Sequence, residues 1–171
     1  MTELSLFTGS GGGLLASALL GWHPIGYVEW TPHCQLTLSQ RMLDGLIPTA
    51  PIFTDIRLFN SQGYAGAYSG LVDVITGGFP CQPFSVAGKQ SGPADVRNMW
   101  PATVETIRIV GPRYVFLENV PNLRSGRHGY FGTVLSDLAS CGYRVRWRVL
   151  SAADVGALHL RKRLWIYGER G

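Results

Sequence analysis

The feature that most constrains the fold is an alternation of short apolar runs with stretches of helical periodicity. Helical stretches at residues 14–20, 32–43 and 99–110 lie between apolar runs, and another follows at 131–141. The apolar runs predict strands at residues 4–7, 25–29, 52–53, 71–75 and 114–118, followed by an antiparallel edge pair at 143–150 and 164–167. This alternation is typical of α/β proteins, in which helices cover both faces of a mostly parallel sheet.

The length and composition are those of one folded domain. The chain has 171 residues, with 46% hydrophobic and 15% charged side chains, which excludes a mainly disordered protein. The sequence contains no repeat or linker, so residues 1–171 are expected to form a single domain. No apolar run approaches the roughly 18 residues of a membrane span, and residues 1–7 lack the basic cluster of a signal peptide. The sequence therefore predicts a cytoplasmic protein without a membrane partner.

Cysteine and histidine are too scattered to build a metal site or a disulfide framework. The three cysteines are Cys34, Cys81 and Cys141, and the four histidines show no ligand spacing. We therefore expect no bound metal.

The basic residues are concentrated in the second half of the chain. Residues 1–96 contain 3 basic and 6 acidic side chains, a net charge of −3, whereas residues 97–171 contain 12 basic and 5 acidic ones, a net charge of +7. Thirteen of the 15 basic residues are arginine, whose planar side chain suits phosphates and base edges. The asymmetry indicates a polyanionic partner such as nucleic acid, with a merely solvated basic surface as the alternative.

Ligands of such sheets bind beyond the carboxyl ends of the strands, so the residues there are the candidates for function. The first strand is followed by a glycine-rich loop at residues 9–13, after which Leu14 departs from the dinucleotide pattern. At the next two strand ends, Glu29 can accept both hydroxyls of a ribose, Trp30 offers a face to an adenine, and Asp55 can accept from its amino group. Together they favour an adenosine-bearing ligand without a pyrophosphate. A plain turn, a capping carboxylate and a core tryptophan are the alternative interpretation.

A second group of reactive residues follows the later strands. Cys81 lies in a long segment without regular periodicity, and such a segment in a compact domain is usually functional. A thiol becomes a nucleophile when cations or helix N-termini lower its pKa, whereas a lone buried cysteine is inert. Glu118 is expected to emerge next to the end of the fourth strand, and so near Cys81, while Arg161 and Arg163 share a face because they alternate along a strand. A capping carboxylate and solvated edge charges are the alternatives here.

These residues belong to a recognisable set of motifs. The hexapeptide Pro-Cys-Gln-Pro-Phe-Ser at residues 80–85 resembles the catalytic motif of the cytosine-C5 DNA methyltransferases. Four further motifs of that family are matched in family order, at residues 7–12, 29–30, 55–56 and 118–120. Residues 161–163 are similar to the Gln-x-Arg-x-Arg motif of the family, except that His159 stands in place of the glutamine.

The resemblance implies a Rossmann-like fold that uses S-adenosylmethionine to methylate C5 of cytosine in double-stranded DNA, as in restriction–modification. The cofactor site that it implies consists of Phe7, Thr8, Gly9, Gly11, Gly12, Glu29, Trp30, Asp55, Ile56, Pro80 and Trp100. The catalytic residues that it implies are Cys81, which attacks C6 of a flipped-out cytosine, Glu118 at N3, Arg163 at O2, and the supporting Arg161. It also implies DNA contacts by Gln82, Ser85, Lys89 and Arg97.

Family members continue past the arginine motif into a target-recognition domain and two late motifs, which these 171 residues do not contain. Three interpretations follow: half of a split enzyme that a partner chain completes, a fragment, or a minimal enzyme with little sequence preference. A module that binds cofactor or DNA without catalysis, and a methyltransferase acting on cytosine in RNA, are further alternatives. We expect DNA methylation.

Overall fold

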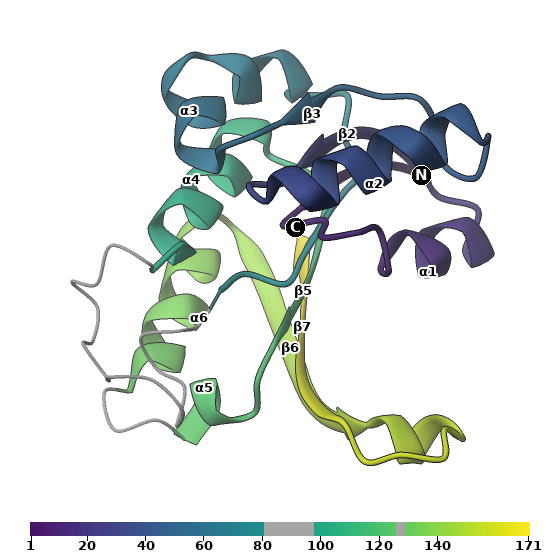
Figure 1. Cartoon of the computed structure of the whole chain (residues 1–171). Helices are drawn as coiled ribbons and strands as arrows, with labels where there is room; N and C mark the ends of the chain where they lie inside the picture. Colours follow the sequence, from purple (N-terminus) through teal and green to yellow (C-terminus); the bar gives the residue numbers. More distant parts are fainter. Residues whose placement is uncertain (81–97, 126–128) are drawn as a thin grey trace.

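The computed structural model describes residues 1–80, 98–125 and 129–171 of the chain (Figure 1). Several predicted site residues lie outside the described residues, namely the nucleophile Cys81 and the DNA contacts Gln82, Ser85, Lys89 and Arg97. The site is therefore built from the strands and helices on either side of them.

A seven-stranded sheet runs through the molecule in the order β3-β2-β1-β4-β5-β7-β6. Its strands are β1 (Thr2–Leu6), β2 (His23–Val28), β3 (Ile52–Phe53), β4 (Val74–Gly77), β5 (Tyr114–Asn119), β6 (Tyr143–Ser151) and β7 (Lys162–Arg170). Strands β1 to β5 pair in parallel, whereas β7 runs antiparallel between β5 and β6. This confirms the predicted α/β class with an antiparallel edge pair. Strands β2 and β3 lie on one side of β1, whereas β4 and β5 lie on the other side. This reversal of the strand order opens a crevice at the carboxyl ends of β1, β2 and β4.

Six α-helices and two 3-10 turns are present in the described ranges. They are α1 (Leu14–Leu19), α2 (Pro32–Leu43), α3 (Ile56–Ser61), η1 (Tyr64–Tyr68), α4 (Trp100–Val110), α5 (Asn122–Ser125), α6 (Tyr130–Ser140) and η3 (Ala152–Val155). None of these helices is long and apolar enough to cross a membrane.

Local sequence signals explain most of the boundaries. Helix α2 begins at the predicted Pro32, which suits a first helical turn because proline lacks the amide that would stay unpaired there. Strand β4 begins later than predicted, since Leu71 is 59% exposed and follows a turn in which Gly70 has φ +76°. Helix α3 was not predicted from periodicity, being only six residues long; it begins after Asp55, whose side chain caps it.

The two faces of the sheet are covered by different helices, as two consecutive residues of β2 show by pointing to opposite faces. Tyr27 packs against Leu14 of α1 and Leu38 of α2 on one face. Val28 belongs to the larger core on the other face, where α3, α4 and α6 pack. The large core includes the fully buried Trp100 and runs from β2 to β7. This packing holds β1, β4 and β5 in fixed register, so the residues at their carboxyl ends have fixed positions.

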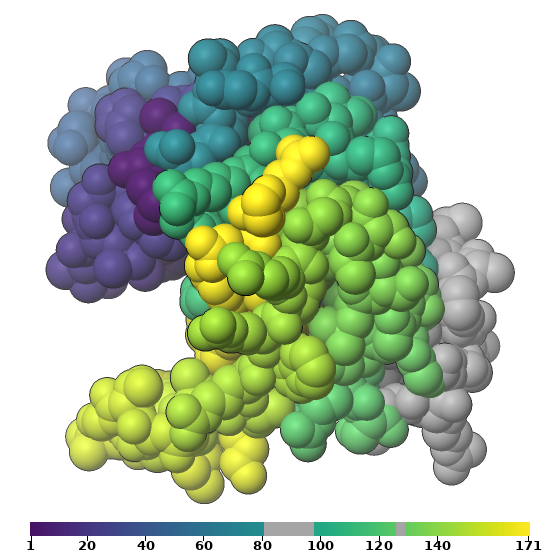
Figure 2. Space-filling model, turned by 180° about the vertical axis from the view of Figure 1, so that it is seen from behind, coloured from purple at the N-terminus to yellow at the C-terminus, as the bar shows by residue number. Residues whose placement is uncertain are grey.

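One sheet face over β5, β7 and β6 is only partly covered in the described part of the chain. Two aromatic pairs stack across β5 and β7: Phe116 with Trp165 at 5.3 Å and Tyr114 with Tyr167 at 6.1 Å between ring centroids. Phe116 is 37% exposed. Figure 2 shows that β7, in yellow, and β6 reach the molecular surface. The side chains of this face, here called the open face, also include the exposed Arg144, Arg146 and Arg148 of β6.

Candidate active site

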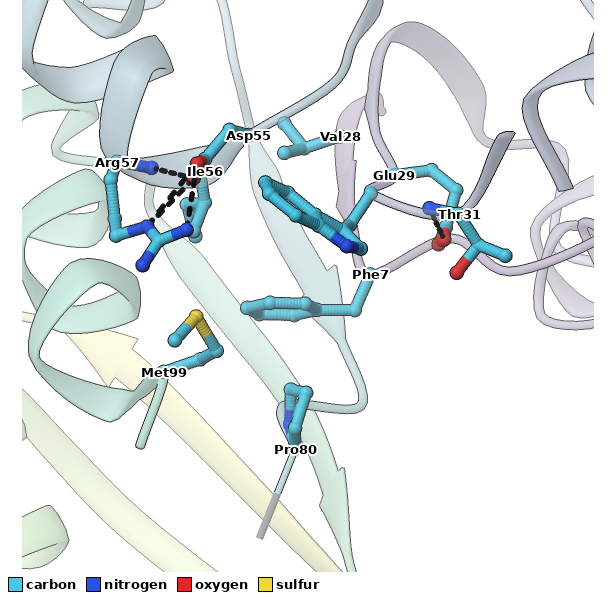
Figure 3. Close-up of a pocket in the computed structure, with 10 residues that line it drawn as sticks. Phe7, Val28, Glu29, Thr31, Asp55, Ile56, Arg57, Pro80 and Met99 are labelled. Carbon is cyan, nitrogen blue, oxygen red and sulfur yellow. Dashed lines mark hydrogen bonds and ion pairs between the residues drawn. The ribbon is translucent and has the colours of Figure 1, made fainter. Parts of the chain in front are cut away.

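A pocket of about 480 Å³ lies at the carboxyl ends of the central strands, where the strand order turns back. Its lining residues come from the carboxyl end of β2, from the segments after β1, β2 and β4, from the start of α3 and from the residue before α4: Phe7, Val28, Glu29, Trp30, Thr31, Asp55, Ile56, Arg57, Pro80 and Met99. In Figure 3, Glu29 and Thr31 lie on one side of the pocket and Asp55 and Arg57 on the other, with Phe7 between them. The volume suits a nucleoside-sized ligand.

The loop after β1 shapes the floor of the pocket. Phe7 has φ +52°, a conformation that costs a non-glycine residue free energy and tends to persist at functional sites. Gly9 and Gly11 follow with φ +58° and +82°, values that glycine adopts without a Cβ clash. A Cβ at Gly11 would also lie 3.1 Å from the side chain of Leu38, so the loop approaches α2 closely. Thr8 anchors this turn by donating its hydroxyl to the carbonyl of Ser5 at 2.9 Å.

Glu29 joins this loop to β2. Its Oε2 accepts from the amide of Gly9 and its Oε1 from the amide of Thr31, both at 2.7 Å. The side chain is buried, with the residue 7% exposed. A carboxylate oxygen can accept two hydrogen bonds, so each oxygen keeps one lone pair for a ligand. Glu29 is therefore both the capping carboxylate and a candidate acceptor for vicinal hydroxyls.

Asp55 and Arg57 form the opposite wall. Oδ1 of Asp55 accepts from the backbone amide of Arg57 at 2.8 Å, and the guanidinium contacts both carboxylate oxygens at 2.9–3.2 Å. The hydrogen bond from the Arg57 side chain is the main reason why the pKa of Asp55 lies below its ordinary value. The same guanidinium lies 5.6 Å from the ring centroid of Trp30, which is 66% exposed. The wall thus combines an ionised acceptor with an accessible aromatic face.

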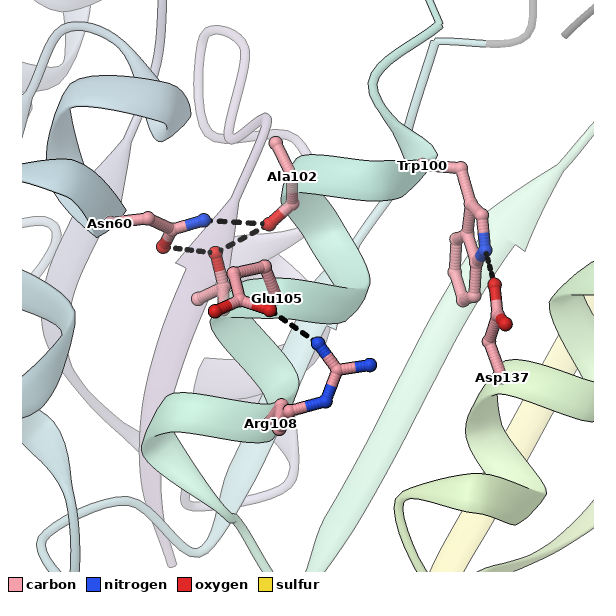
Figure 4. Close-up of polar contacts among 7 residues, drawn as sticks. Asn60, Trp100, Ala102, Glu105, Arg108 and Asp137 are labelled. Carbon is pink, nitrogen blue, oxygen red and sulfur yellow. Dashed lines mark hydrogen bonds and ion pairs between the residues drawn. The ribbon is translucent and has the colours of Figure 1, made fainter.

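The predicted cofactor residues fall into three groups. Those that line the pocket are Phe7, Glu29, Trp30, Asp55, Ile56 and Pro80. Those that shape the adjoining loop without lining the pocket are Thr8, Gly9, Gly11 and Gly12. The side chain of Trp100 belongs to neither group, because it is 1% exposed and its Nε1 donates to Asp137 of α6 at 2.8 Å (Figure 4).

Four lining residues were not predicted: Val28, Thr31, Arg57 and Met99. Each is a direct neighbour, or the second neighbour, of a residue that was singled out. Position beside a strand end was the available signal for Val28, Thr31 and Arg57, whereas Met99 directly precedes α4. Arg57 carried a further signal because it is a cation two residues after a capping aspartate.

A second cluster lies where β4 and β5 end side by side. Glu118 forms an ion pair with Nε of Arg163, which projects from β7. Gly78 follows β4 and leaves room for this carboxyl, since a Cβ there would lie 2.9 Å from Oε2 of Glu118. The expected position of Glu118 beside the end of the fourth strand is therefore observed. Arg161 is exposed and precedes β7, with its carbonyl accepting from the amide of Ala152 at 3.1 Å.

Asn119 forms a hydrogen bond between the end of β5 and the segment that follows β4. Its Nδ2 donates to the carbonyl of Phe79 at 3.0 Å, and its Oδ1 accepts from the amide of Val120 at 2.8 Å. Phe79 is followed by Pro80, which lines the pocket. The chain segment that leads to Cys81 is thus held between the pocket and the pair of Glu118 and Arg163.

Comparison with known proteins decides the family. Residues 1–171 match the model of the family described as C-5 cytosine-specific DNA methylase. The chain belongs to this family. The family's motifs at residues 29–30 and 55–56 contribute to the pocket, and those at 118–120 and 161–163 contribute Glu118 and Arg163 to the second cluster.

This methylase-family chain is similar to the type II methyltransferases of bacteria. It is 34% identical to M.NgoMIV of Neisseria gonorrhoeae over 95% of its own length and 50% of that protein, and 34% identical to M.NaeI of Lentzea aerocolonigenes over 38% of that protein. With M.AquIA of Picosynechococcus it shares 33% identity over 98% of its own length and 71% of that protein. The chain therefore spans half or less of the first two relatives.

Solved structures support the methylase fold. A DNA methyltransferase candidate encoded within an E. coli prophage superposes with a TM-score of 0.76 at 23% identity, covering 99% of this chain and 47% of that one. The S. pombe Dnmt2 methyltransferase superposes with a TM-score of 0.74 at 17% identity, covering 99% and 49%. At these identities the likeness concerns the fold.

Proposed function

We propose that residues 1–171 form one catalytic domain that transfers a methyl group from S-adenosylmethionine to C5 of cytosine in double-stranded DNA. The observation that carries this proposal is the position of the segment after β4. Pro80 lines the nucleoside-sized pocket, while a Cβ at Gly78 would lie 2.9 Å from Oε2 of Glu118. A nucleophile at Cys81 would therefore act between a cofactor site and a cluster suited to a pyrimidine ring.

The pocket residues fit the adenosine part of the cofactor. The free lone pairs of Glu29 suit the two ribose hydroxyls, and the exposed ring of Trp30 suits one face of the adenine. Asp55 suits its exocyclic amine, since the carboxylate stays ionised. When bound, S-adenosylmethionine supplies an electrophilic methyl group. The chain's own contribution is to hold the adenosine at β1 and β2 and to present the base at β4 and β5.

The proposed chemistry raises the nucleophilicity of C5 before methyl transfer. The thiolate of Cys81 attacks C6 of a cytosine flipped out of the duplex, because its reactive atoms are inaccessible inside the stack. Glu118 hydrogen-bonds N3 and offsets the charge that develops on the ring, while Arg163 binds O2 and Arg161 supports it electrostatically. After transfer, loss of the C5 proton expels the thiolate and restores the aromatic base.

DNA contacts are proposed for the residues near the nucleophile. Gln82, Ser85, Lys89 and Arg97 would contact the DNA, with the hydroxyl of Ser85 as a donor to a phosphate. The arginine-rich second half of the chain supports a duplex partner. Binding should therefore weaken steeply as the salt concentration rises.

Methyl transfer by the purified chain tests this function. The protein is mixed with methyl-labelled S-adenosylmethionine and a cytosine-rich duplex, with Cys81→Ser as the matched control and transfer RNA as the competing substrate. Label recovered as 5-methylcytosine in DNA, and absent with Cys81→Ser, supports the proposal. Label in RNA alone supports the RNA alternative. Wild-type rates with Cys81→Ser would contradict the proposed nucleophile.

The open face favours a second candidate, in which a further polypeptide completes the enzyme. Both faces of a mostly parallel sheet are normally covered, yet Phe116 and the arginines of β6 remain exposed. The chain also spans half or less of M.NgoMIV and M.NaeI. A folded chain that binds S-adenosylhomocysteine but transfers no label would support this candidate, and transfer by the chain alone would contradict it.

A further inference from the structure

Arg57 contacts two other residues that line the pocket, Asp55 and Trp30, although its side chain is largely exposed to solvent. It is the second residue of α3, its side chain is 53% exposed, and it nevertheless contacts both oxygens of Asp55. An ion pair with so exposed a partner contributes only about 0–1 kcal/mol to folding. The side chain also lies over the ring of Trp30. Its contacts therefore join the two side chains that the proposed function assigns to the adenine.

The hydrogen bonds at Asp55 leave one oxygen available. Oδ1 accepts from the backbone amide and from Nε of Arg57, at 2.8 and 3.0 Å, which fills its two lone pairs. Oδ2 accepts from Nη2 at 2.9 Å, with a longer contact of 3.2 Å from Nε. The guanidinium thus fixes the rotation of the carboxylate and leaves Oδ2 as the acceptor for one further N–H donor.

We propose that Arg57 is a positioning residue that selects a 6-aminopurine in the pocket by orienting Oδ2 of Asp55 and the ring of Trp30. This inference rests on the proposed cofactor site. The amino group of adenine donates to the oriented oxygen, whereas a 6-oxopurine would place its own acceptor against it. Two acceptors that face each other repel. The oriented oxygen of Asp55 therefore binds a 6-aminopurine and disfavours a 6-oxopurine.

The test compares two ligands that differ at this one position, S-adenosylhomocysteine and S-inosylhomocysteine, by calorimetric titration of the wild-type chain. Arg57→Ala should weaken binding of S-adenosylhomocysteine about tenfold, the scale of one charge-assisted hydrogen bond. It should change binding of S-inosylhomocysteine much less. Arg57→Lys should fall between wild type and Arg57→Ala, because an ammonium keeps the charge without the bidentate geometry.

Arg108→Ala is the matched control, since Arg108 forms an exposed ion pair with Glu105 on α4 (Figure 4). It should bind both ligands as the wild type does. Thermal unfolding of each variant establishes that it is folded, and Arg57→Gln replaces Arg57→Ala if the latter is not.

A pH profile separates positioning from a general loss of structure. In the wild type, Arg57 holds the pKa of Asp55 below its ordinary value of 3.8, so affinity for S-adenosylhomocysteine should stay level as the pH falls to that value. In Arg57→Ala the pKa of Asp55 rises, so affinity should begin to fall at a higher pH than in the wild type.

The outcomes are distinct. An equal loss for both ligands, or wild-type binding of both by Arg57→Ala, would overturn the role of Arg57 while leaving the cofactor site in place. A folded wild-type chain that fails to bind S-adenosylhomocysteine would contradict the proposed cofactor site and this inference with it.

Discussion

The side-chain amide of Asn119, at the end of β5, donates to the backbone carbonyl of Phe79, two residues after β4, at 3.0 Å. Both residues are buried, with 2% and 4% of their surfaces exposed. Phe79 stands two residues before the proposed nucleophile, and Asn119 directly follows Glu118. One hydrogen bond therefore links Phe79, near the end of the described segment after β4, to the strand end that carries Glu118.

We predict that Asn119→Ala lowers kcat for methyl transfer at least tenfold and leaves the affinity for S-adenosylhomocysteine within about twofold of wild type. The free energy of unfolding should fall by about 1–3 kcal/mol, because the carbonyl of Phe79 loses its partner. Steady-state kinetics and urea unfolding measure the two effects.

Asn60→Ala is the control for this change. Asn60 also holds a backbone carbonyl, that of Ala102, and accepts from the hydroxyl of Thr106 (Figure 4), and it does not line the pocket. It should lose comparable stability with little change in kcat. Equal kinetic losses in the two variants would show that Asn119 acts through stability alone.

Gly78→Ala should disturb the second cluster. The new Cβ would lie 2.9 Å from Oε2 of Glu118, so the carboxyl must move away from Arg163 or from the base. We expect methyl transfer to fall about tenfold or more with cofactor affinity retained. Gly132→Ala on α6 is the matched control, since nothing lies within 4 Å of its Cβ position and alanine favours a helix. An unchanged rate with Gly78→Ala would remove the close approach of Glu118 from the mechanism.

Glu29→Gln tests the double role of that carboxylate. An amide can accept at only one of its two ends, so either Gly9 or Thr31 would face an NH₂ donor. We expect S-adenosylhomocysteine to bind at least tenfold more weakly, as calorimetry would measure. Glu105→Gln, on the surface of α4, should bind normally. Unchanged affinity with Glu29→Gln would argue against Glu29 as a ligand for the ribose.

Glu3 should make stability depend on pH. It is 1% exposed, its Oε2 has no partner among the described residues, and burial raises its pKa. A raised pKa in the folded state means that stability is fully present below the ordinary value of 4.5 and declines as the pH rises through the folded-state value. Glu3→Gln should remove this decline.

Urea unfolding at pH 5 and pH 8 measures the effect. The difference in unfolding free energy between Glu3→Gln and the wild type should shift by about 1 kcal/mol in favour of the variant as the pH rises. A parallel pH dependence in the two proteins would contradict the prediction. Asp55 acts in the opposite direction, because its lowered pKa adds stability that is lost on acidification.

The strand ends could be predicted from the sequence because parallel strands bring their carboxyl ends together. From this rule the sequence predicted that Glu29 and Asp55 belong to one site and that Glu118 lies beside the end of β4; both residues of the first pair line the pocket, and Glu118 approaches Gly78. Side-chain direction could not be predicted in the same way. Trp100 was expected at the cofactor, but its ring packs against Phe79 in the core, and the preceding Met99 lines the pocket instead.

Arg57 was missed for a related reason. A cation in the first turn of a short helix usually belongs to a solvated surface, and only the fold places it over Trp30, 27 residues earlier in the chain. Contacts between distant segments depend on packing, which local periodicity does not contain.

The position of β7 inside the sheet also governs the order of assembly on the ribosome. β6 is made before β7 but, among the strands that the structure describes, pairs only with β7. Until translation has passed residue 170, β6 has no strand to join and the edge of β5 stays unpaired. The nascent chain thus exposes a strand edge that other chains could pair with. The strand that completes the sheet also carries Arg163, which pairs with Glu118. A chain released before β7 is made would therefore lack the complete sheet and this ion pair.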